Sequence, residues 1–375
     1  MHYLDNAATT RVLPEAAEAA VHAMCEGFGN PSSLHKMGIE ASHLLEDSRK
    51  TVASALGCLP EETYFTSCGT ESTNISLRGA AHLNRHKKGR IITTEIEHAA
   101  TLNTCKQLAA EGFDVVFLAP DGTGHITPAA LEEALTADTI LLSCQLVNNE
   151  IGTVQPVAEL GALLKAKAPG ALFHIDTVQG LCRVKLTPKK WNCDLMSVSG
   201  HKIGAPKGIG ALYVKKGLRL PPLMFGGGQE KGMRPGTEPL PNIAAFAKAC
   251  EIRMAHFDED YAHVAELAAY LKEQAAANLP DAAFNGQGDV PHVVNLSIPG
   301  CKSEVMLRVL EGDEVYVSSG SACSKGKQSG VLRALSLPKA RTDSAIRVSF
   351  APFNTKEDVD AFIAAAKKGV KMLRR

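Results

Sequence analysis

One lysine stands where an apolar run ends, between a histidine and a loop rich in glycine and proline. The run covers residues 195–198 and leads through Ser199 and His201 to Lys202 and Gly204. A strand that ends in such a loop presents its last side chains at the edge of a sheet, where α/β proteins place their ligands. Ser199, His201 and nearby main-chain N–H groups could hold a phosphate, and Lys202 could form a Schiff base with an aldehyde. These two functions together indicate the cofactor pyridoxal 5'-phosphate (PLP).

A lysine of this kind is more often a solvated loop residue, so the interpretation depends on other stretches. The most specific is the stretch in which Asp176 ends the expected buried strand 172–175. A buried carboxylate needs a positive partner, and the protonated ring nitrogen of PLP is one, since this pairing makes the cofactor a better electron sink. Gln179 could reach the ring hydroxyl. Taken alone, Asp176 could equally cap the following helix.

Polar residues follow other expected strands. Gly69 and Thr70 lie where a helix should begin, a favourable place for a phosphate, although Thr70 could simply be an N-cap. His98 ends a strand and could stack on a flat heterocycle and move protons, although a lone histidine is more often structural. Asn148 could hydrogen-bond a cofactor hydroxyl or a substrate carboxylate. Thr237, in a glycine-rich loop that also carries a cation, could reach a phosphate, including that of a neighbouring subunit.

A cysteine and an arginine complete the candidates. Cys323 lies in a polar loop over residues 318–330, and Lys325 and Lys327 supply the positive charge that favours a reactive thiolate. Arg347 stands inside the expected strand 346–350, where an arginine is unusual. A substrate carboxylate bound by both arms of the guanidinium would explain it.

Composition excludes several classes of protein. The 375 residues carry 40 basic and 40 acidic side chains, so charge gives no argument for a nucleic acid or an anionic membrane as partner. Without a signal peptide or an apolar run that could span a membrane, the chain is expected to be soluble and cytoplasmic. Its 10 cysteines form no C-x-x-C pair, which predicts mostly buried thiols. His82 and His86 lack a third ligand, and no metal site is expected.

Short apolar runs alternate with helical patterns between residues 63 and 214, which predicts an α/β fold with a largely parallel sheet covered on both faces. One alanine-rich helix is expected over residues 243–279. Beyond it, fewer strands and longer helices predict a smaller α+β domain. The predicted division is a large cofactor domain over residues 15–255 and a small domain from residues 1–14 and 256–375 that carries the cysteine loop.

The sequence resembles the cysteine desulfurases of the iron–sulfur-cluster and nitrogen-fixation type, which are fold-type I PLP enzymes of the class V aminotransferase group. The resemblance covers essentially the whole chain, and its most specific matches are residues 147–152, 199–202, 232–237 and 318–323. It implies a mostly parallel seven-stranded sheet in the large domain. Departures at Cys68 and Gly69 and at Gly204 and Ala205 exchange small or loop residues and should be tolerated.

The resemblance also implies a role for each candidate. Lys202 would hold PLP covalently and, with His98, move protons. Free L-cysteine would be the substrate, and Cys323 would take its sulfur, leaving a persulfide and L-alanine. Asn148 and Arg347 would hold the substrate carboxylate. The implied cofactor contacts are Gly69, Thr70, His98, Asn148, Asp176, Gln179, Ser199, His201, Lys202 and, from the second subunit of a homodimer, Thr237.

Several hypotheses for the sulfur acceptor and for the function remain open. The persulfide would pass to an acceptor protein for iron–sulfur cluster assembly, cofactor sulfuration or tRNA thiolation, and Cys323 could transiently ligate a nascent cluster. The chain ends soon after its last expected helix, which leaves the acceptor open. A selenocysteine lyase or another class V aminotransferase-like enzyme is one alternative, although a transaminase needs no thiol. A non-catalytic scaffold is another, which Lys202 and Asp176 argue against.

Overall fold

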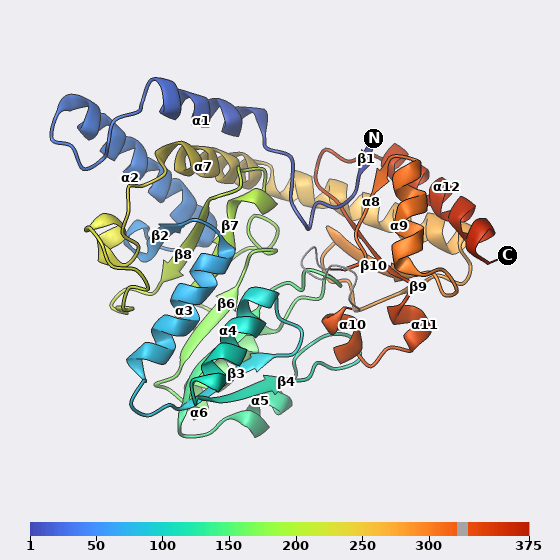
Figure 1. The fold of residues 1–375 in the computed structure, drawn as a ribbon, viewed down its shortest axis with the longest axis horizontal. Helices are drawn as coiled ribbons and strands as arrows, with labels where there is room; N and C mark the ends of the chain where they lie inside the picture. The colour runs from blue at the N-terminus through green and yellow to red at the C-terminus, as the bar shows by residue number, and fades with distance from the viewer. Residues whose placement is uncertain (321–328, 375) are drawn as a thin grey trace.

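A seven-stranded sheet forms the centre of the larger part of the molecule (Figure 1). The structure is a computed structural model that describes residues 1–320 and 329–374. The strand order is β2-β8-β7-β6-β5-β3-β4, and only β8 runs antiparallel to its neighbours. The strands are β2 (Thr63–Thr66), β3 (Arg90–Thr94), β4 (Asp114–Leu118), β5 (Thr139–Gln145), β6 (Leu172–Asp176), β7 (Leu195–Ser199) and β8 (Gly210–Val214). The predicted α/β fold with a mostly parallel seven-stranded sheet is confirmed.

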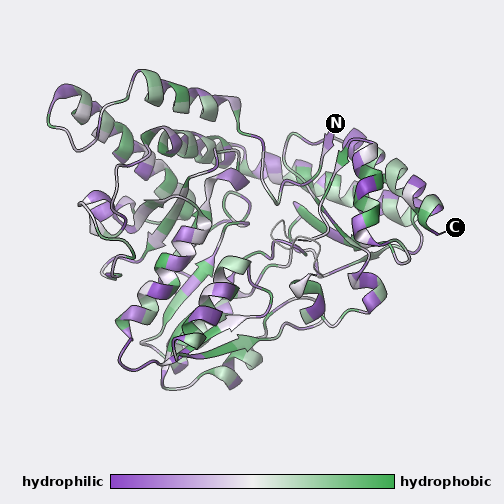
Figure 2. Ribbon diagram, viewed as in Figure 1, coloured by the Kyte–Doolittle hydropathy of each residue, from purple (hydrophilic) through white to green (hydrophobic). Residues whose placement is uncertain are grey.

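Helices cover both faces of this sheet. Successive strand residues point to opposite faces of the sheet, and a separate hydrophobic cluster forms on each face. Ile91 and Leu141 pack with α3 (Gly69–Leu83) and α4 (Ala99–Ala110), whereas Ile92 and Leu142 pack with α5 (Pro128–Ala134) and α6 (Val157–Lys167). Figure 2 shows the resulting concentration of apolar residues on the central strands. Strands buried on both faces explain why they appear in the sequence as continuous apolar runs.

Three more helices lie beside the sheet at the edge that carries β2 and β8. They are α1 (Pro14–Cys25), α2 (Lys36–Leu56) and α7 (Leu240–Ala255), and α7 packs against both of the others. Local signals set their ends: Pro14 occupies the first turn of α1, and Gly57 ends α2 in the left-handed conformation, with a φ of 68°.

The prediction of a single helix over residues 243–279 is wrong, because the structure has two helices there. The first, α7, ends at Ala255, and α8 (Phe257–Asn278) begins after His256, which leaves the helical conformation with a ψ of 16°. An ion pair between Arg253 and Asp260 spans the break at 2.9 Å. An alanine-rich pattern is helical on both sides of such a bend, so the sequence does not show it.

A second hydrophobic core lies around a three-stranded antiparallel sheet, in the order β12-β10-β9. Leu4 and the helices α8 and α12 contribute to this core. Its elements are β9 (Ala283–Phe284), β10 (Val293–Ser297), α9 (Ser303–Gly312), β12 (Ala345–Ser349) and α12 (Lys356–Leu373), with β1 (His2–Tyr3) paired to β11 (Val315–Tyr316) and short helices α10 (Gly330–Ala334) and α11 (Lys339–Thr342). The predicted division at residues 255 and 256 stays a prediction.

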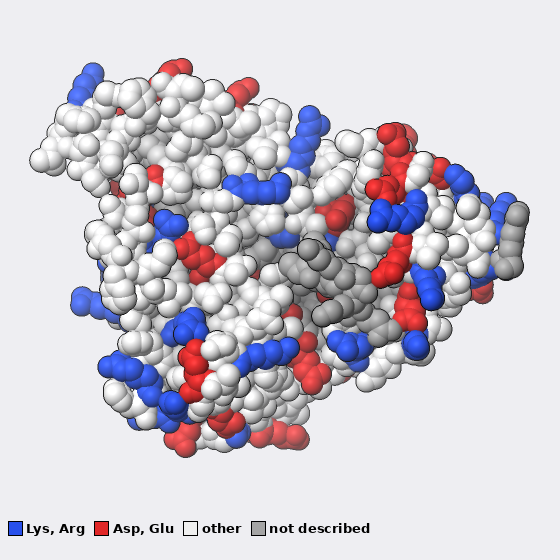
Figure 3. Space-filling model, viewed as in Figure 1, with Lys and Arg blue, Asp and Glu red and all other residues white. Residues whose placement is uncertain are grey.

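Basic and acidic side chains are interspersed over the face shown in Figure 3, as the balanced composition predicts. Within residues 1–320 and 329–374, no helix is long and apolar enough to cross a membrane. The described part of the chain also contains no group of three or more His, Cys, Asp and Glu residues that could hold a metal ion.

Candidate active site

The carboxyl ends of the parallel strands open into a cavity of about 220 Å³. β6 ends there at Asp176 and β7 at Ser199, while α3 and α4 begin beside them. This edge is where open α/β sheets place their ligands. Most of the residues predicted from the sequence line this one cavity, namely Gly69, Thr70, His98, Asp176, Gln179, Ser199, His201, Lys202 and Arg347.

Lys202 ends a short 3-10 helix, η2 (Gly200–Lys202), that follows β7 directly. Its Nζ donates to the main-chain oxygens of Ala7 and Ala8, at 2.6 and 2.7 Å. Burial, with help from the positive charges of Arg347 and Arg183, lowers the pKa of Lys202 to about 7. A lysine in this state is partly uncharged at neutral pH, which is what attack on an aldehyde requires.

Asp176 and His98 face the same cavity. Burial raises the pKa of Asp176, while His98 and Lys202 act in the opposite direction, and one carboxylate oxygen accepts the Val178 N–H at 3.0 Å. Burial also lowers the pKa of His98. The Nδ1 atom of His98 accepts the Ala100 N–H at 3.1 Å, so the neutral ring carries its proton on Nε2. Both side chains are therefore oriented by the backbone.

The end of the cavity nearest α3 is suited to an anion. The hydroxyls of Ser199 and Thr73 are buried and have no hydrogen-bond partner within the described residues, and both side chains line the cavity. Gly69 opens α3, and a Cβ there would lie only 2.8 Å from the side chain of Val178. Free N–H groups of the first helical turn and these two hydroxyls could together hold a phosphate. His201 is neutral there, since burial and Lys202 lower its pKa to about 4.

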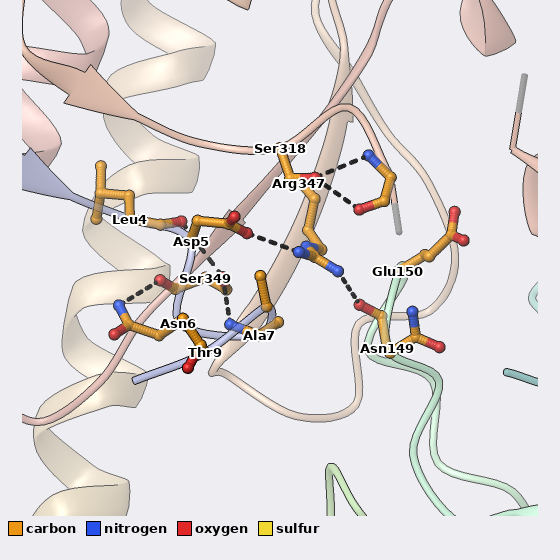
Figure 4. A network of polar contacts seen from close by, with 12 residues as sticks. Leu4, Asp5, Asn6, Ala7, Thr9, Asn149, Glu150, Ser318, Arg347 and Ser349 are labelled. Carbon is orange, nitrogen blue, oxygen red and sulfur yellow. Dashed lines mark hydrogen bonds and ion pairs between the residues drawn. The ribbon is translucent and has the colours of Figure 1, made fainter. Parts of the chain in front are cut away.

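Arg347 enters the cavity from β12, in the other sheet, and is only 1% exposed. Figure 4 shows its guanidinium between Asp5 and Asn149. One Nη donates to the Asp5 carboxylate at 2.6 Å and the other to the main-chain oxygen of Asn149 at 2.8 Å, while Nε is buried without a partner in the described chain. Burial raises the pKa of Asp5, and Arg347 opposes that shift. A substrate carboxylate would share this guanidinium with Asp5.

The structure brings Asn149, not Asn148, to the cavity. The Oδ1 atom of Asn148 accepts the N–H groups of Glu150 and Ile151 at 2.8 and 3.0 Å, and its Nδ2 donates to the Ile96 oxygen at 3.0 Å. Asn148 therefore holds the turn after β5, while its neighbour lines the wall. Two adjacent asparagines in a turn look alike in the sequence, so only the turn geometry separates them.

Two further predictions concern Thr237 and Cys323. Thr237 is exposed and does not line the cavity of its own chain. Cys323 lies outside the residues that the structure describes, so its role stays a prediction.

The sequence did not single out several residues that shape the site. The main-chain oxygens of Ala7 and Ala8 hold Lys202, and Asp5 holds Arg347. Glu97, next to His98, is buried, and this burial raises its pKa to about 8. The stretch holds two glutamates, Glu95 and Glu97, and the sequence pattern does not show that only Glu97 is buried.

The family model described as aminotransferase class-V matches residues 2–362. The chain belongs to this family. A cysteine desulfurase of Trichormus azollae is 40% identical over 99% of this chain and 93% of its own length, and a cysteine desulfurase IscS of Methanosarcina thermophila is 40% identical over 99% and 92%. A solved NifS-like protein superposes with a TM-score of 0.94 at 36% identity, covering 99% of both chains.

PLP is the cofactor of this family, and the residues present fit it. The unpartnered hydroxyls of Ser199 and Thr73 lie where a phosphate needs donors, and Gly69 leaves room beside them. Asp176 would offer a buried carboxylate to the ring nitrogen, and Lys202 would offer its amine to the aldehyde.

Proposed function

We propose that the protein is a PLP-dependent cysteine desulfurase that converts free L-cysteine to L-alanine and leaves the sulfur as a persulfide on Cys323. The observation that carries the proposal is the meeting of Lys202, Asp176 and His98 with Arg347 in one cavity. The first three suit PLP chemistry at an amino acid, and Arg347 suits the carboxylate of that amino acid. A similar solved structure, 33% identical with a TM-score of 0.84, is described as SspA in complex with cysteine.

When bound, PLP supplies an aldehyde for the amine and a ring that draws electrons away from the substrate. Asp176 pairs with the ring nitrogen and stays ionised because it gains a positive partner. Gly69, Thr70, Ser199 and His201 hold the phosphate. The PLP cavity thus fixes the cofactor at both ends.

Two groups move protons in this cavity. Lys202, with a pKa of about 7, can both accept and return a proton near neutral pH. His98 has Nδ1 occupied by the Ala100 N–H, which leaves Nε2 as the nitrogen that exchanges a proton with the substrate. Arg347 and, in our proposal, Asn149 rather than Asn148 orient the substrate carboxylate beside them.

Cys323 performs the sulfur transfer. Its thiolate attacks the substrate sulfur, an S–S bond forms, and the carbon–sulfur bond breaks with its electron pair left on the carbon fragment. Protonation of that fragment gives alanine. Support for Cys323 comes from the cations Lys325 and Lys327 beside it in the sequence.

We also propose that the enzyme is a homodimer in which Thr237 reaches the phosphate of the partner subunit. The exposed position of Thr237, away from the cavity of its own chain, supports this. Large apolar side chains in the loop between α1 and α2 and in the loop after β8, namely Phe28, Leu34 and Phe225, are 65%, 94% and 91% exposed, and a second copy would cover them. Sedimentation of the purified protein tests the proposal, because a monomer at all concentrations would contradict it.

The persulfide sulfur would pass to an acceptor protein. The relatives named IscS and NifS-like support iron–sulfur cluster assembly as the destination of the sulfur. A solved structure described as DndA from Streptomyces lividans, 39% identical with a TM-score of 0.78, has a similar fold under a different name. We therefore propose iron–sulfur cluster assembly as the preferred use of the sulfur and tRNA thiolation as the second candidate.

The test is product formation from L-cysteine by the purified, PLP-loaded protein. We expect sulfide, released by a thiol reductant, and alanine in equal amounts. Cys323→Ser should abolish both and keep the visible band near ~400 nm. Cys25→Ser, at an exposed cysteine of α1, is the matched control and should behave as wild type.

Full sulfide release by Cys323→Ser would contradict the assignment of the thiol. A keto acid in place of alanine would indicate a transaminase, and turnover of L-selenocysteine alone would indicate a selenocysteine lyase.

A further inference from the structure

Arg183 joins two parts of the PLP cavity without lining it. It follows β6 in a helical turn, and its two Nη atoms donate to Oε1 of Gln179 at 2.9 Å and to the main-chain oxygen of Lys202 at 2.8 Å. Lys202 also borders a second, smaller cavity of about 50 Å³, and Arg183 lines that one instead. Arg183 therefore reaches the PLP cavity only through other residues.

These contacts belong to a closed ring of hydrogen bonds. Arg183 donates to Gln179, Nε2 of Gln179 donates to the Ala7 oxygen at 2.9 Å, and Nζ of Lys202 donates to the same oxygen at 2.6 Å. The bond from Arg183 to the Lys202 oxygen closes the ring. The ring ties together the N-terminal segment, the turn after β6 and η2, three segments far apart in the sequence.

The ring fixes which way the amide of Gln179 points. A guanidinium can only donate, so Oε1 must face Arg183, and a main-chain oxygen can only accept, so Nε2 must face Ala7. Gln179 thus turns its N–H groups towards Ala7, which lines the same cavity. Without Arg183, only the Ala7 oxygen would hold the amide in this orientation.

Arg183 also places a charge beside Lys202. Among the described residues Arg183 has no carboxylate partner, and burial together with Arg253 lowers its own pKa to about 10. The other charged groups that act on Lys202 are Arg347 from β12, Asp5 from the N-terminal segment and Asp176 from β6, with His98 and His201 as titratable neighbours.

We propose that Arg183 is a positioning residue, which holds the amide of Gln179 and the backbone of Lys202 in the arrangement that captures PLP. The inference rests on the proposed function only in taking PLP as the aldehyde. It predicts that the guanidinium acts in two separable ways, through its charge and through its two-pronged shape.

The test follows the appearance of the visible band when PLP is added to the full-length chain freed of cofactor, from about pH 6 to about pH 9. Wild type should show a midpoint near the Lys202 pKa of about 7. Arg183→Met removes a like charge and should move the midpoint upward by about one pH unit. Arg183→Lys keeps the charge and should keep the midpoint, but an ammonium cannot span both acceptors, so PLP should dissociate about tenfold faster.

Arg308→Met, at an exposed arginine of α9, is the control and should match wild type in both readouts. A wild-type midpoint in Arg183→Met would overturn the charge role, and wild-type PLP dissociation in Arg183→Lys would overturn the positioning role. Circular dichroism checks folding, and if Arg183→Met does not fold, the Arg183→Lys dissociation rate decides. A wild-type chain that never forms the band would instead contradict the proposed function.

Discussion

The two walls of the PLP cavity are built in different ways. The first, here called the sheet wall, consists of Asp176, Ser199 and Lys202 at the ends of β6 and β7, with His98 at the start of α4. The second, here called the assembled wall, consists of residues 5–8, Asn149 and Arg347. In Figure 1 the N-terminal segment runs from β1 past the end of the central sheet towards α1.

The difference between the walls suggests a division of work. The sheet wall uses strand ends that the fold places together by itself, and its groups suit the cofactor. The assembled wall exists only when distant segments meet: Arg347 and Asp5 are separated by 342 positions. Its donors, which include the Arg347 Nε that has no partner in the described chain, suit the substrate carboxylate. We therefore expect changes in the sheet wall to stop the chemistry and changes in the assembled wall to weaken substrate binding.

The largest expected effect is that of Lys202→Ala in the sheet wall. It removes the only amine that the cavity offers among its described lining residues, so the visible band should disappear and sulfide release should fall by at least about a thousandfold. Lys207→Ala, at an exposed lysine five residues on, is the control. Retention of the band in Lys202→Ala would break the distinction between the walls.

Asp176→Asn should be the next largest. An amide cannot pair with a protonated ring nitrogen as a carboxylate does, so kcat should fall by about a hundredfold while the visible band remains. Steady-state rates with L-cysteine measure this, with the exposed Asp138→Asn as control. An unchanged kcat would remove Asp176 from the sheet wall's chemistry.

Glu97, the neighbour of His98 in the sheet wall, is tested through the pH dependence of the free energy of unfolding. One of its oxygens accepts from the Thr94 hydroxyl and the Gln145 N–H, at 2.8 and 2.9 Å, and burial raises its pKa from 4.5 to about 8. Between these two values the folded chain binds more protons than the unfolded chain, so the free energy of unfolding should fall as pH rises. Glu97→Gln should remove a slope of up to about 1.4 kcal/mol per pH unit.

Urea unfolding between about pH 5 and about pH 8 measures this slope. The exposed Glu18→Gln should keep the wild-type slope. Equal slopes in wild type and Glu97→Gln would show that Glu97 is ionised in the folded chain.

The smallest expected effect lies in the assembled wall. Arg347→Lys keeps a positive charge but loses the fork that bonds Asp5 and Asn149, so KM for L-cysteine should rise about tenfold with kcat within about twofold. Arg308→Lys, at an exposed site, is the control. A fall in kcat with an unchanged KM would show that the assembled wall acts in the chemistry and not in substrate binding.

The comparison also explains what the sequence predicts. Asp176 and Ser199 end expected strands, and Lys202 follows Ser199 by three residues, so local pattern and the rule for strand ends place them correctly. The carbonyl groups of Ala7 and Ala8, the Asp5–Arg347 pair and the Arg183 ring depend on contacts between distant segments, which no local pattern contains.

Local ambiguity accounts for the rest. Asn148 and Asn149 differ only in which one the turn after β5 uses for its own hydrogen bonds. The break at His256 lies in a stretch whose residues favour a helix on both sides. The burial of Glu97 arises from its contact with Gln145 at the end of β5, almost fifty positions away.

The most direct test of the account is to find the sulfur atom after one turnover. The PLP-loaded protein is mixed with one equivalent of L-cysteine without reductant, digested, and its cysteine-containing peptides are weighed by mass spectrometry. The account predicts one added sulfur on the peptide that contains Cys323, and none in Lys202→Ala. An added sulfur on a different cysteine, or alanine formed with no sulfur bound to the protein, would contradict it.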